Sequence, residues 1–551
     1  MPLREAPTFF GPNAARARAA FDEYEALYGD PRPEIVVRAQ LTGMTDDAIA
    51  AIAGANLGVY VRSGMLVSIV RDGSDPTTWL RRAPDAPVIV RLTRDQVLAR
   101  MDRAALWVRP GKDEDAEKKP VLPPANIAAQ VLARAHWPFP YLLSVIETPT
   151  IRRDGSILST PGYDAASALL YEPPPGESAW PVVPEFPSRE DVTAAVRALL
   201  DPARDFPFVG DSDRAAYVAA LLTLVARHCI DGPAPMFAVR APTPGTGKSL
   251  LVALIGLIGT GREPAAMTMT GDADELRKRV VSIALSGTPV VLLDNASGVL
   301  GSDVLAAFLT ANDVEDRLLG RSEMVRVPLR AVWLATGNNL GFRKTLGRRV
   351  VPIDLDANRE APEDREGFAY PDILAHVKRE RPGLVTAALT ILRGFAVARR
   401  PAHGQGARMG SFEAWDDAIR AVVVWAGLAD PAGTSNPESG RARVRAEADT
   451  DTEELSALLA ALAIAFPVAE RFTTDELMRR AANDPGLKRV LDLAAPSPNG
   501  RDATVRSIGY KLRAVENRPL GGRRLVKAGR RSDVRLWAVL SLGMDGDSPP
   551  F

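Results

Sequence analysis

The feature of this 551-residue chain that most constrains its fold is an alternation of apolar runs and helical segments over residues 233–360. The apolar runs are short and rich in β-branched residues, as expected for buried strands. In chain order they are PMFAVR, AAMTMT, PVVLLD, AVWLATGN and RVVPIDLD. This order predicts an α/β domain whose mostly parallel sheet is covered by helices on both faces.

The loop after the first run, APTPGTGKSLL at residues 241–251, nearly matches a phosphate-binding loop. The usual pattern is Gly, four residues and Gly-Lys-Ser/Thr, and here Pro242 replaces the first glycine. Phosphates are held mainly by backbone N–H groups at the start of the following helix. The glycines that allow this backbone conformation, Gly245 and Gly247, therefore matter most. We expect Lys248 to contact the β- and γ-phosphates of ATP and Ser249 to bind Mg²⁺. The predicted nucleotide contacts are Pro244, Gly245, Thr246, Gly247, Lys248, Ser249 and Leu250.

The run PVVLLDNAS ends in Asp294, where a carboxylate is expected to hold Mg²⁺ through water. The next residue is Asn295, at the position where many such ATPases carry the glutamate that activates water. An amide can orient a nucleophile but cannot accept its proton. The catalytic base therefore stays open, with Asp294 and Glu275 as candidates.

The run AVWLATGNN ends in Asn338 and Asn339, and we expect the Asn338 amide to position the attacking water. About ten residues on, Arg348 and Arg349 precede another apolar run, RVVPIDLD. Two adjacent arginines here suit an arginine finger, which stabilises transition-state charge on ATP held by a neighbouring subunit. Surface ion pairing is the other interpretation of this pair.

Composition excludes several classes of protein. No apolar run approaches 18 uncharged residues and the first ten residues hold no signal-peptide core, so neither a membrane segment nor secretion is predicted. The one cysteine, Cys229, excludes a disulfide framework and a Cys-rich zinc site, and its apolar neighbours predict a buried structural thiol in a reducing cytoplasm. A formal net charge of zero argues against a uniformly basic nucleic-acid binder.

The pattern divides the chain into several segments. We predict a hairpin turned at Ser63-Gly64, a helix over 92–108 and a polar connector over 433–454. The predicted segments are a mixed α+β accessory domain (1–110), a β/α segment (121–187), a helical linker (188–232), the α/β core (233–360), a helical region (361–433) and a C-terminal domain (453–545).

The C-terminal domain carries a concentrated positive charge. Residues 497–535 hold eleven Arg or Lys against three Asp or Glu, a net charge of +8. The order helix, helix and β-hairpin is a winged-helix pattern, in which the second helix and the wing meet DNA. The candidate DNA contacts are Arg501, Arg506, Lys511, Arg513, Arg523, Arg524, Lys527, Arg530 and Arg531. A winged helix used for protein contacts is the alternative.

The order of these elements resembles the superfamily 3 helicases of the AAA+ class, and most closely the helicase modules of phage-type primase-helicases of prophages and mobile elements. The stretches that carry the resemblance include TIRRDGSILSTPGYD, VVLLDNASG, DRLLGRSEMVRVPLRAVWLATGNN and LGRRVVPIDLD, and they cover roughly residues 140–430. It implies an AAA+ ATPase core and a homo-oligomeric ring, expected to be a hexamer, that pulls one DNA strand through its channel. It also implies a DNA-gripping hairpin whose basic tip is Arg321, with Ser322 beside it and Arg317 as a second candidate.

The first 130 residues depart from the fused primase-helicases, because they show no acidic cluster and no zinc module. We therefore expect this region to dock a partner or load the ring, with any primase acting as a separate protein. Two other functions stay open. One is an origin-binding ATP switch with little turnover, which Asn295 favours, and the other is an AAA+ protein remodeller.

Overall fold

The computed structural model describes residues 31–71, 80–83, 85–111, 118–174, 180–296, 298–317, 324–402, 404, 406–467, 469–495, 502–532 and 534–541. The side chains of residues 317, 344, 448–453 and 514 also lie outside the description. The chain forms two compact units. The sheet unit holds the chain up to Leu340 together with Arg349–Arg441, and the tail unit holds Gly341–Arg348 together with the chain from Ala442 onward.

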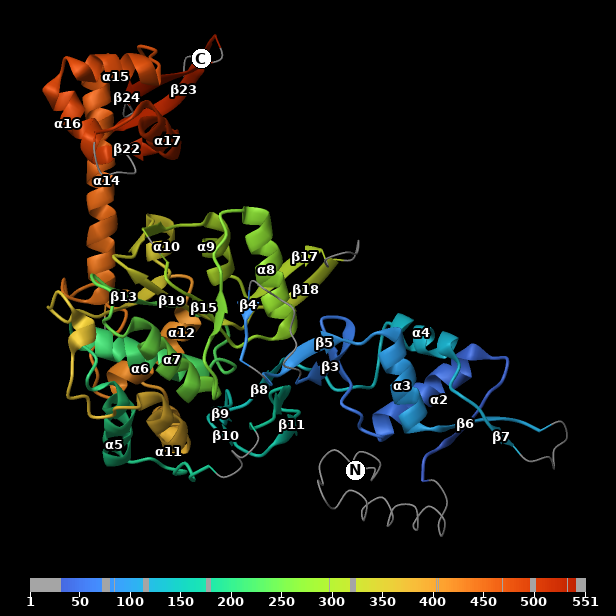
Figure 1. Ribbon diagram of the computed structural model, residues 1–551. Helices are drawn as coiled ribbons and strands as arrows, with labels where there is room; N and C mark the ends of the chain where they lie inside the picture. Colours follow the sequence, from blue (N-terminus) through green and yellow to red (C-terminus); the bar gives the residue numbers. More distant parts are fainter. Residues whose placement is uncertain are drawn as a thin grey trace. The chain divides into compact units, whose positions relative to one another are not determined.

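A six-stranded sheet forms the centre of the sheet unit (Figure 1). Five strands are parallel in the order β21-β13-β19-β15-β14, and β4 is antiparallel at the edge beside β14. The strands are β4 (Leu80–Arg81), β13 (Met236–Ala241), β14 (Ala265–Met267), β15 (Val290–Leu293), β19 (Val332–Asn338) and β21 (Val350–Asp354). The predicted parallel sheet is confirmed, and the carboxyl ends of β13, β15 and β19 share one edge.

Helices cover both faces of this sheet, as predicted. Figure 1 shows α6 (Asp211–Val225) and α7 (Lys248–Thr260) on one side of it and α8 (Ala273–Ser286) and α9 (Asp303–Leu309) on the other. Every residue of α6 from Ala215 to Val225 is buried, because this helix lies between the sheet and further helices. These further elements are α5 (Arg189–Leu200), η3 (Asp201–Ala203), η4 (Pro362–Asp364), α11 (Ile373–Val397), α12 (Glu413–Trp415), η5 (Asp416–Arg420) and α13 (Ala421–Trp425).

One hydrophobic core joins segments that the sequence suggested as separate. Trp415 lies edge-on against Phe237 of β13, and its Nε1 donates to Thr223 Oγ1 of α6 over 2.9 Å. The same cluster of buried side chains runs from α5 to residues after α13. The helices flanking the α/β core on both sides therefore pack into it.

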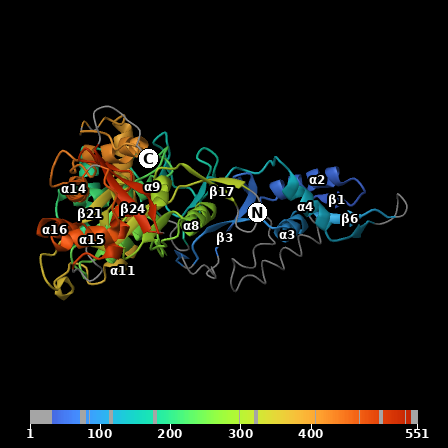
Figure 2. The same ribbon diagram turned by 90° about the horizontal axis from the view of Figure 1, so that it is seen from above.

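The first part of the chain mixes strands and helices. The hairpin turned at Ser63 and Gly64 is confirmed, with φ of 52° and 72° at these residues, as a tight two-residue turn requires. Helices α2, α3 and α4 pack against one another, and Figure 2 shows them side by side. The elements are β1 (Glu34–Val36), α2 (Leu41–Gly54), β2 (Tyr60–Arg62), β3 (Met65–Val70), β5 (Val88–Arg91), α3 (Arg94–Ala104), β6 (Leu106–Arg109), β7 (Lys119–Pro120) and α4 (Ala125–Ala133).

The predicted helix over 92–108 is wrong at its C-terminal end. It ends at Ala104, and Leu106–Arg109 form β6, parallel to β1. Trp107 is buried in this strand, and its Nε1 donates to Met101 O over 3.1 Å. Burial of a large aromatic side chain in a sheet outweighed the helical spacing of the apolar residues.

Short strands follow in residues 141–174, as predicted around the two turns. They are β8 (Ser144–Ile146), β9 (Thr150–Ile151), β10 (Ile157–Leu158), β11 (Gly162–Asp164) and β12 (Leu169–Tyr171). Arg152 and Asp164 form a bidentate ion pair of 2.9 and 3.0 Å, which lowers the pKa of Asp164 to about 2. Later, β17 (Asp313–Arg317) and β18 (Met324–Pro328) form an antiparallel hairpin that packs on α8 (Figure 2). The chain also holds β16 (Val299–Leu300), β20 (Gly341–Phe342) and α10 (Lys344–Gly347).

The tail unit combines helices with a three-stranded antiparallel sheet, β22-β23-β24. The predicted hairpin is confirmed as β23 paired with β24. The helices and strands of this part of the chain are α14 (Gly440–Ala465), α15 (Thr474–Ala482), α16 (Pro485–Ala494), α17 (Val505–Val515), β22 (Pro519–Leu520), β23 (Arg523–Arg531) and β24 (Val534–Ser541).

One prediction for this part of the chain is wrong, and one helix was not predicted. The connector over 433–454 is wrong from Gly440 onward, since α14 begins there; its residues are polar, but Arg, Ala and Glu are good helix formers. Helix α16 was missed, although Asp484 caps it through Leu487 N and Pro485 starts it. In the described part of the chain, none of the helices combines the length and apolarity needed to cross a membrane.

Candidate functional site

The loop between β13 and α7 has the backbone conformation that its two glycines predicted. Gly245 and Gly247 have φ of 74° and 90°, which residues with a Cβ rarely adopt. Helix α7 begins directly after Gly247, at Lys248. The free N–H groups of its first turn, on which Ser249 is exposed and Leu250 partly buried, can therefore receive an anion from this loop.

The Lys248 side chain lies back on the loop. Its Nζ donates to Thr243 O over 3.0 Å and to Thr246 Oγ1 over 3.1 Å. Thr246 is buried, Pro244 is exposed, and partial burial lowers the pKa of Lys248. A triphosphate in the loop would supply the negative charge that these neutral oxygens do not.

Two residues that are distant from the loop in sequence pack against it. A Cβ at Gly245 would collide with the carboxylate of Glu363 in η4, and a Cβ at Gly247 would lie 3.1 Å from Cε1 of Phe206. Only glycine fits this loop beside those neighbours. Glu363 also brings a negative charge against the loop, which opposes the binding of phosphate on that side. No local signal marks either residue in the sequence.

Asp294 follows β15 and is held by a residue of the neighbouring strand. Thr336 Oγ1, on β19, donates to Asp294 Oδ1 over 2.6 Å and accepts from the N–H of Asn295 over 2.9 Å. Asn295 itself adopts φ of 51° and its side chain is exposed. A Cβ at Gly337 would collide with Ala296 O, so the turn after β15 lies directly on β19. Thr336 was missed by sequence reasoning, although it is a lone hydroxyl in the apolar run AVWLATGNN.

The two asparagines at the end of β19 differ in their bonding. Asn339 ties this strand to the loop, because its N–H donates to Ala241 O over 3.0 Å and its Nδ2 to Pro242 O over 3.2 Å. Asn338 has a buried Oδ1 for which no partner is found among the described residues. An amide left with an unsatisfied atom at this edge is suited to bind a water or a ligand group.

Strand order therefore brings the main predicted residues together. Lys248, Asp294 and Asn338 follow the carboxyl ends of β13, β15 and β19, which are adjacent parallel strands. Ligands of open α/β sheets bind at this edge. One carboxylate, a serine hydroxyl and phosphate oxygens are a suitable ligand set for Mg²⁺. Glu275, the other candidate base, is on the first turn of α8, where its Oε1 accepts from Arg279 Nε over 3.0 Å.

Arg349 lies at the amino ends of the parallel strands, opposite to the end that carries the phosphate loop. Its carbonyl accepts from the N–H of Met236, the first residue of β13, over 3.0 Å. The length of β13 puts it about 20 Å from the loop of its own chain. Arg348 belongs to the tail unit and is exposed. Arg349 is therefore too far from the loop of its own chain to contact a phosphate bound there.

A buried ion pair supports the strand that carries the loop, and it was not predicted. Arg240 of β13 binds Asp354 of β21 in bidentate fashion, with Nε–Oδ1 of 2.7 Å and Nη2–Oδ2 of 3.0 Å. Asp213 Oδ1, fully buried on α6, accepts from the N–H of Asp354 over 2.9 Å. Charged residues inside the apolar runs MFAVRA and VVPIDL were the available signal.

Among the residues predicted to grip DNA, Arg321 and Ser322 lie outside the described residues, as does Arg501. Arg317 ends β17, but its side chain is not described. The hairpin on which they were predicted is present, with β17 and β18 in register from Asp313–Pro328 to Arg317–Met324. Arg326 of β18 is exposed and pairs with Asp313 over 2.8 Å.

Helix α17 brings a basic and aromatic face together in the tail unit. Arg506, Tyr510 and Arg513 are exposed at positions i, i+4 and i+7, which share one face of a helix. The guanidinium of Arg513 lies 5.4 Å from the centre of the Tyr510 ring. Lys511 is partly buried and points away from this face by its position in the helix. Tyr510 was missed by sequence reasoning, although its helical spacing from the two arginines is visible in GRDATVRSIGYKLR.

The other basic residues of the tail are on β23. Lys527, Arg530 and Arg531 are exposed, and a register shift between Lys527 and Arg530 interrupts the pairing with β24. Arg531 pairs with Glu476 over 3.1 Å, which removes part of its charge from the surface. Arg523 donates to Gly521 O over 3.2 Å and Arg524 is partly buried, whereas Lys527 and Arg530 are exposed.

No protein-family model matches the chain, and no curated protein matches it significantly. Among solved structures, the apo A form of the NrS-1 C-terminal region has 12% identity and a TM-score of 0.34, with 86% of this chain and 96% of that chain covered. The SCCmec type IV Cch active helicase has 12% identity and a TM-score of 0.32, with 88% and 97% covered. The JCV helicase has 16% identity and a TM-score of 0.21, with 43% and 67% covered.

Proposed function

We propose that this chain is an ATP-dependent DNA helicase or replication initiator of a mobile genetic element, working as a ring with ATP hydrolysed between adjacent copies. The observation that carries the proposal is the meeting of Lys248, Asp294 and Asn338 at the carboxyl edge of three adjacent parallel strands. A lysine, a carboxylate and an amide are the groups that P-loop ATPases use on phosphates, Mg²⁺ and water.

The chain's own residues supply binding, charge and orientation. Backbone N–H groups of the loop and Lys248 neutralise phosphate charge, while Ser249 and Asp294 hold Mg²⁺, which supplies Lewis acidity at the phosphates when it is bound. Thr336 fixes the Asp294 carboxylate through its hydroxyl. Asn338 orients the attacking water, and Arg349 of a neighbouring copy stabilises charge in the transition state.

A basic surface of the tail unit supports DNA as the polymer on which the chain acts. The α17 face offers two arginines and an exposed tyrosine, a combination that contacts phosphates and stacks on bases without reading sequence. Arg321, which the sequence predicts at the tip of the β17–β18 hairpin, is the second contact that we propose. The winged-helix role of the tail and a hexameric ring are parts of the same proposal.

The exposed Asn295 favours one rival, an origin-binding ATP switch with little turnover, because this residue cannot act as a base. ATP turnover with and without single-stranded DNA distinguishes the two functions. A helicase predicts turnover stimulated by DNA and abolished in Lys248→Ala. Slow turnover that DNA does not change, together with tight nucleotide-dependent DNA binding, would favour the switch.

The hairpin gives a test with a matched control. Arg321→Ala should retain ATP hydrolysis and lose unwinding of forked DNA, whereas Arg326→Ala on the same hairpin should retain both. Normal unwinding by Arg321→Ala would remove the hairpin from the mechanism. If neither single- nor double-stranded DNA stimulates turnover, the helicase proposal fails.

A further inference from the structure

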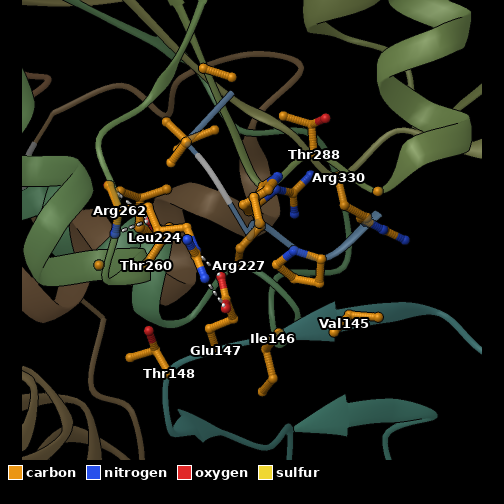
Figure 3. A pocket seen from close by; sticks show the side chains of 18 of the residues that line it. Val145, Ile146, Glu147, Thr148, Leu224, Arg227, Thr260, Arg262, Thr288 and Arg330 are labelled. Carbon is orange, nitrogen blue, oxygen red and sulfur yellow. Dashed lines mark hydrogen bonds and ion pairs between the residues drawn. The ribbon is translucent and has the colours of Figure 1, made fainter. Parts of the chain in front are cut away.

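A cavity of about 80 Å³ lies in the sheet unit at the amino ends of the parallel strands, opposite to the end that carries the phosphate loop. Thr288, Pro289 and Val290 line it at the start of β15, and Gly259 and Thr260 line it at the end of α7. Because Lys248 begins α7 and Thr260 ends it, the two sites are separated by the length of that helix, about 18 Å. Figure 3 shows the side chains that surround the cavity.

Two arginines that line this cavity have few hydrogen-bond partners. Arg227 is 3% exposed, its Nε has no hydrogen-bond partner among the residues that the structure describes, and its Nη1 reaches Ile230 O over 3.5 Å. Arg330 has a buried Nε without a partner in the described part of the chain, and its Nη1 reaches Gly232 O over 3.4 Å. Neither arginine forms an ion pair with a carboxylate of the described residues. Guanidinium groups buried in this way are normally paired.

Burial and mutual repulsion lower the pKa values of the basic groups in this cavity. Burial, followed by repulsion from Arg330, lowers the pKa of Arg227 to about 9. The neighbouring His228 has a buried Nδ1 to which none of the described residues bonds. Burial, then repulsion from Arg227, Arg330 and Arg62, lowers the pKa of His228 to about 3. The cavity is therefore electropositive, and it disfavours any further positive charge.

Glu147, a carboxylate that lines the cavity, is already paired elsewhere. Glu147 receives Arg71 Nη1 over 2.6 Å and Arg262 Nε and Nη2 over 2.7 and 2.9 Å. Glu263, at the cavity rim, is exposed. The carbonyls at the end of α7 carry partial negative charge, but Leu257 O already accepts from Arg381 Nε over 2.8 Å. Asp231 and Asp313 offset part of the charge of Arg330, but they pair with Arg153 and Arg326.

We propose that this cavity binds a small phosphate-bearing anion through the guanidinium groups of Arg227 and Arg330. Guanidinium forks match phosphate oxygens in pairs, and the free Nε atoms provide donors for such bonds. Val145, Ile146 and Leu224 line the cavity as well, so an organic phosphate can place an apolar part against them. The inference does not depend on ATP hydrolysis at Lys248, because the two sites share no residue.

The test uses the full chain carrying Lys248→Ala, so that the phosphate loop cannot account for binding. Inorganic phosphate and adenosine monophosphate are titrated separately by calorimetry, and thermal unfolding is measured with each. Binding of either probe is expected, and it should weaken by about tenfold or more in Arg227→Met. The control Arg214→Met removes an exposed arginine of α6, which pairs with Asp211 at the surface, and should bind as the parent does.

The outcomes separate the sources of the phosphate group. Binding of inorganic phosphate alone identifies a free oxyanion as the ligand, whereas binding of the nucleotide alone identifies an organic phosphate; both support the proposal. If Arg227→Met fails to fold, Arg330→Met takes its place. Failure of both probes to bind the Lys248→Ala chain, or equal binding by folded Arg227→Met, overturns the proposal. Neither result bears on ATP turnover, which is measured on the wild-type chain.

Discussion

Thr336 donates a 2.6 Å hydrogen bond from its hydroxyl to Oδ1 of Asp294, across two adjacent strands of the central sheet. The same hydroxyl oxygen accepts from the N–H of Asn295. One buried side chain therefore fixes both the carboxylate proposed to hold Mg²⁺ and the turn that carries it. Groups that orient a metal ligand in this way commonly affect metal affinity as strongly as activity.

We predict that Thr336→Val raises the Mg²⁺ concentration needed for half-maximal ATP turnover by about tenfold or more, because the carboxylate loses its orienting bond. The valine also leaves the Asn295 N–H without its acceptor, which should lower the free energy of unfolding by about 1–3 kcal/mol. Turnover against Mg²⁺ concentration is the measurement. Thr336→Ser keeps the hydroxyl and should behave as the wild type; an unchanged Mg²⁺ dependence in Thr336→Val would refute the positioning role.

A second prediction concerns the carboxylate of Glu363 against the phosphate loop. Glu363→Gln should tighten the binding of ATP by about threefold to tenfold, because it removes a negative charge close to the phosphates. Titration of a fluorescent ATP analogue measures the dissociation constant. Asp364→Asn removes the same charge from the next residue, which is exposed, and should change affinity less. Weaker binding by Glu363→Gln would mean that this carboxylate assists the nucleotide.

The basic face of α17 makes a third prediction. Tyr510→Ala should weaken binding of single-stranded DNA by about 1–3 kcal/mol, because a stacking surface is lost. Arg506→Ala should weaken binding and also reduce the slope of log affinity against log salt by about 1, because one phosphate contact is lost. Arg479→Ala, an exposed arginine of α15, is the control. Equal effects of all three substitutions would indicate a diffuse charge effect and no defined face.

A fourth prediction follows from His228. Its pKa in the folded chain, about 3, lies below the ordinary value of 6.5, so the unfolded chain takes up this proton first as the pH falls. The free energy of unfolding should therefore fall below about pH 6.5, by at most about 1.4 kcal/mol per pH unit from this group.

Denaturant unfolding between about pH 5 and 6.5 checks this, with His228→Gln expected to flatten the loss. The exposed His136→Gln is the control and should keep the wild-type slope. Parallel slopes for wild type and His228→Gln would show that His228 is not held neutral by its surroundings.

The sequence predicted the parts of the fold that depend on local pattern. The apolar runs became the five parallel strands, and the glycines at 245 and 247 adopted positive φ, because periodicity and backbone geometry are local properties. The residues around the phosphate loop were different. Phe206 and Glu363 reach it from segments about 40 and 115 residues away, and such contacts leave no mark in the local sequence.

Errors in the helices have equally physical causes. The stretch from Gly440 was judged by polarity, whereas helix propensity decided its structure. Trp107 followed the helical spacing of α3 but gained more from burial in β6. The apolar runs mark Arg240 and Asp354 as buried charges, but the sequence does not show which charged residues face each other inside a core, either here or in the cluster at Arg227.

Hydrolysis of ATP between two copies of this chain is tested most directly by mixing two inactive variants. Lys248→Ala keeps Arg349 but has no working phosphate loop, and Arg349→Ala keeps the loop but lacks the arginine proposed to act on the neighbouring copy. Each alone should be inactive, and an equal mixture should recover about a quarter of wild-type turnover, because about that share of random interfaces joins an intact loop to an intact arginine. A mixture as inactive as its components, or full turnover by Arg349→Ala alone, would contradict hydrolysis between copies.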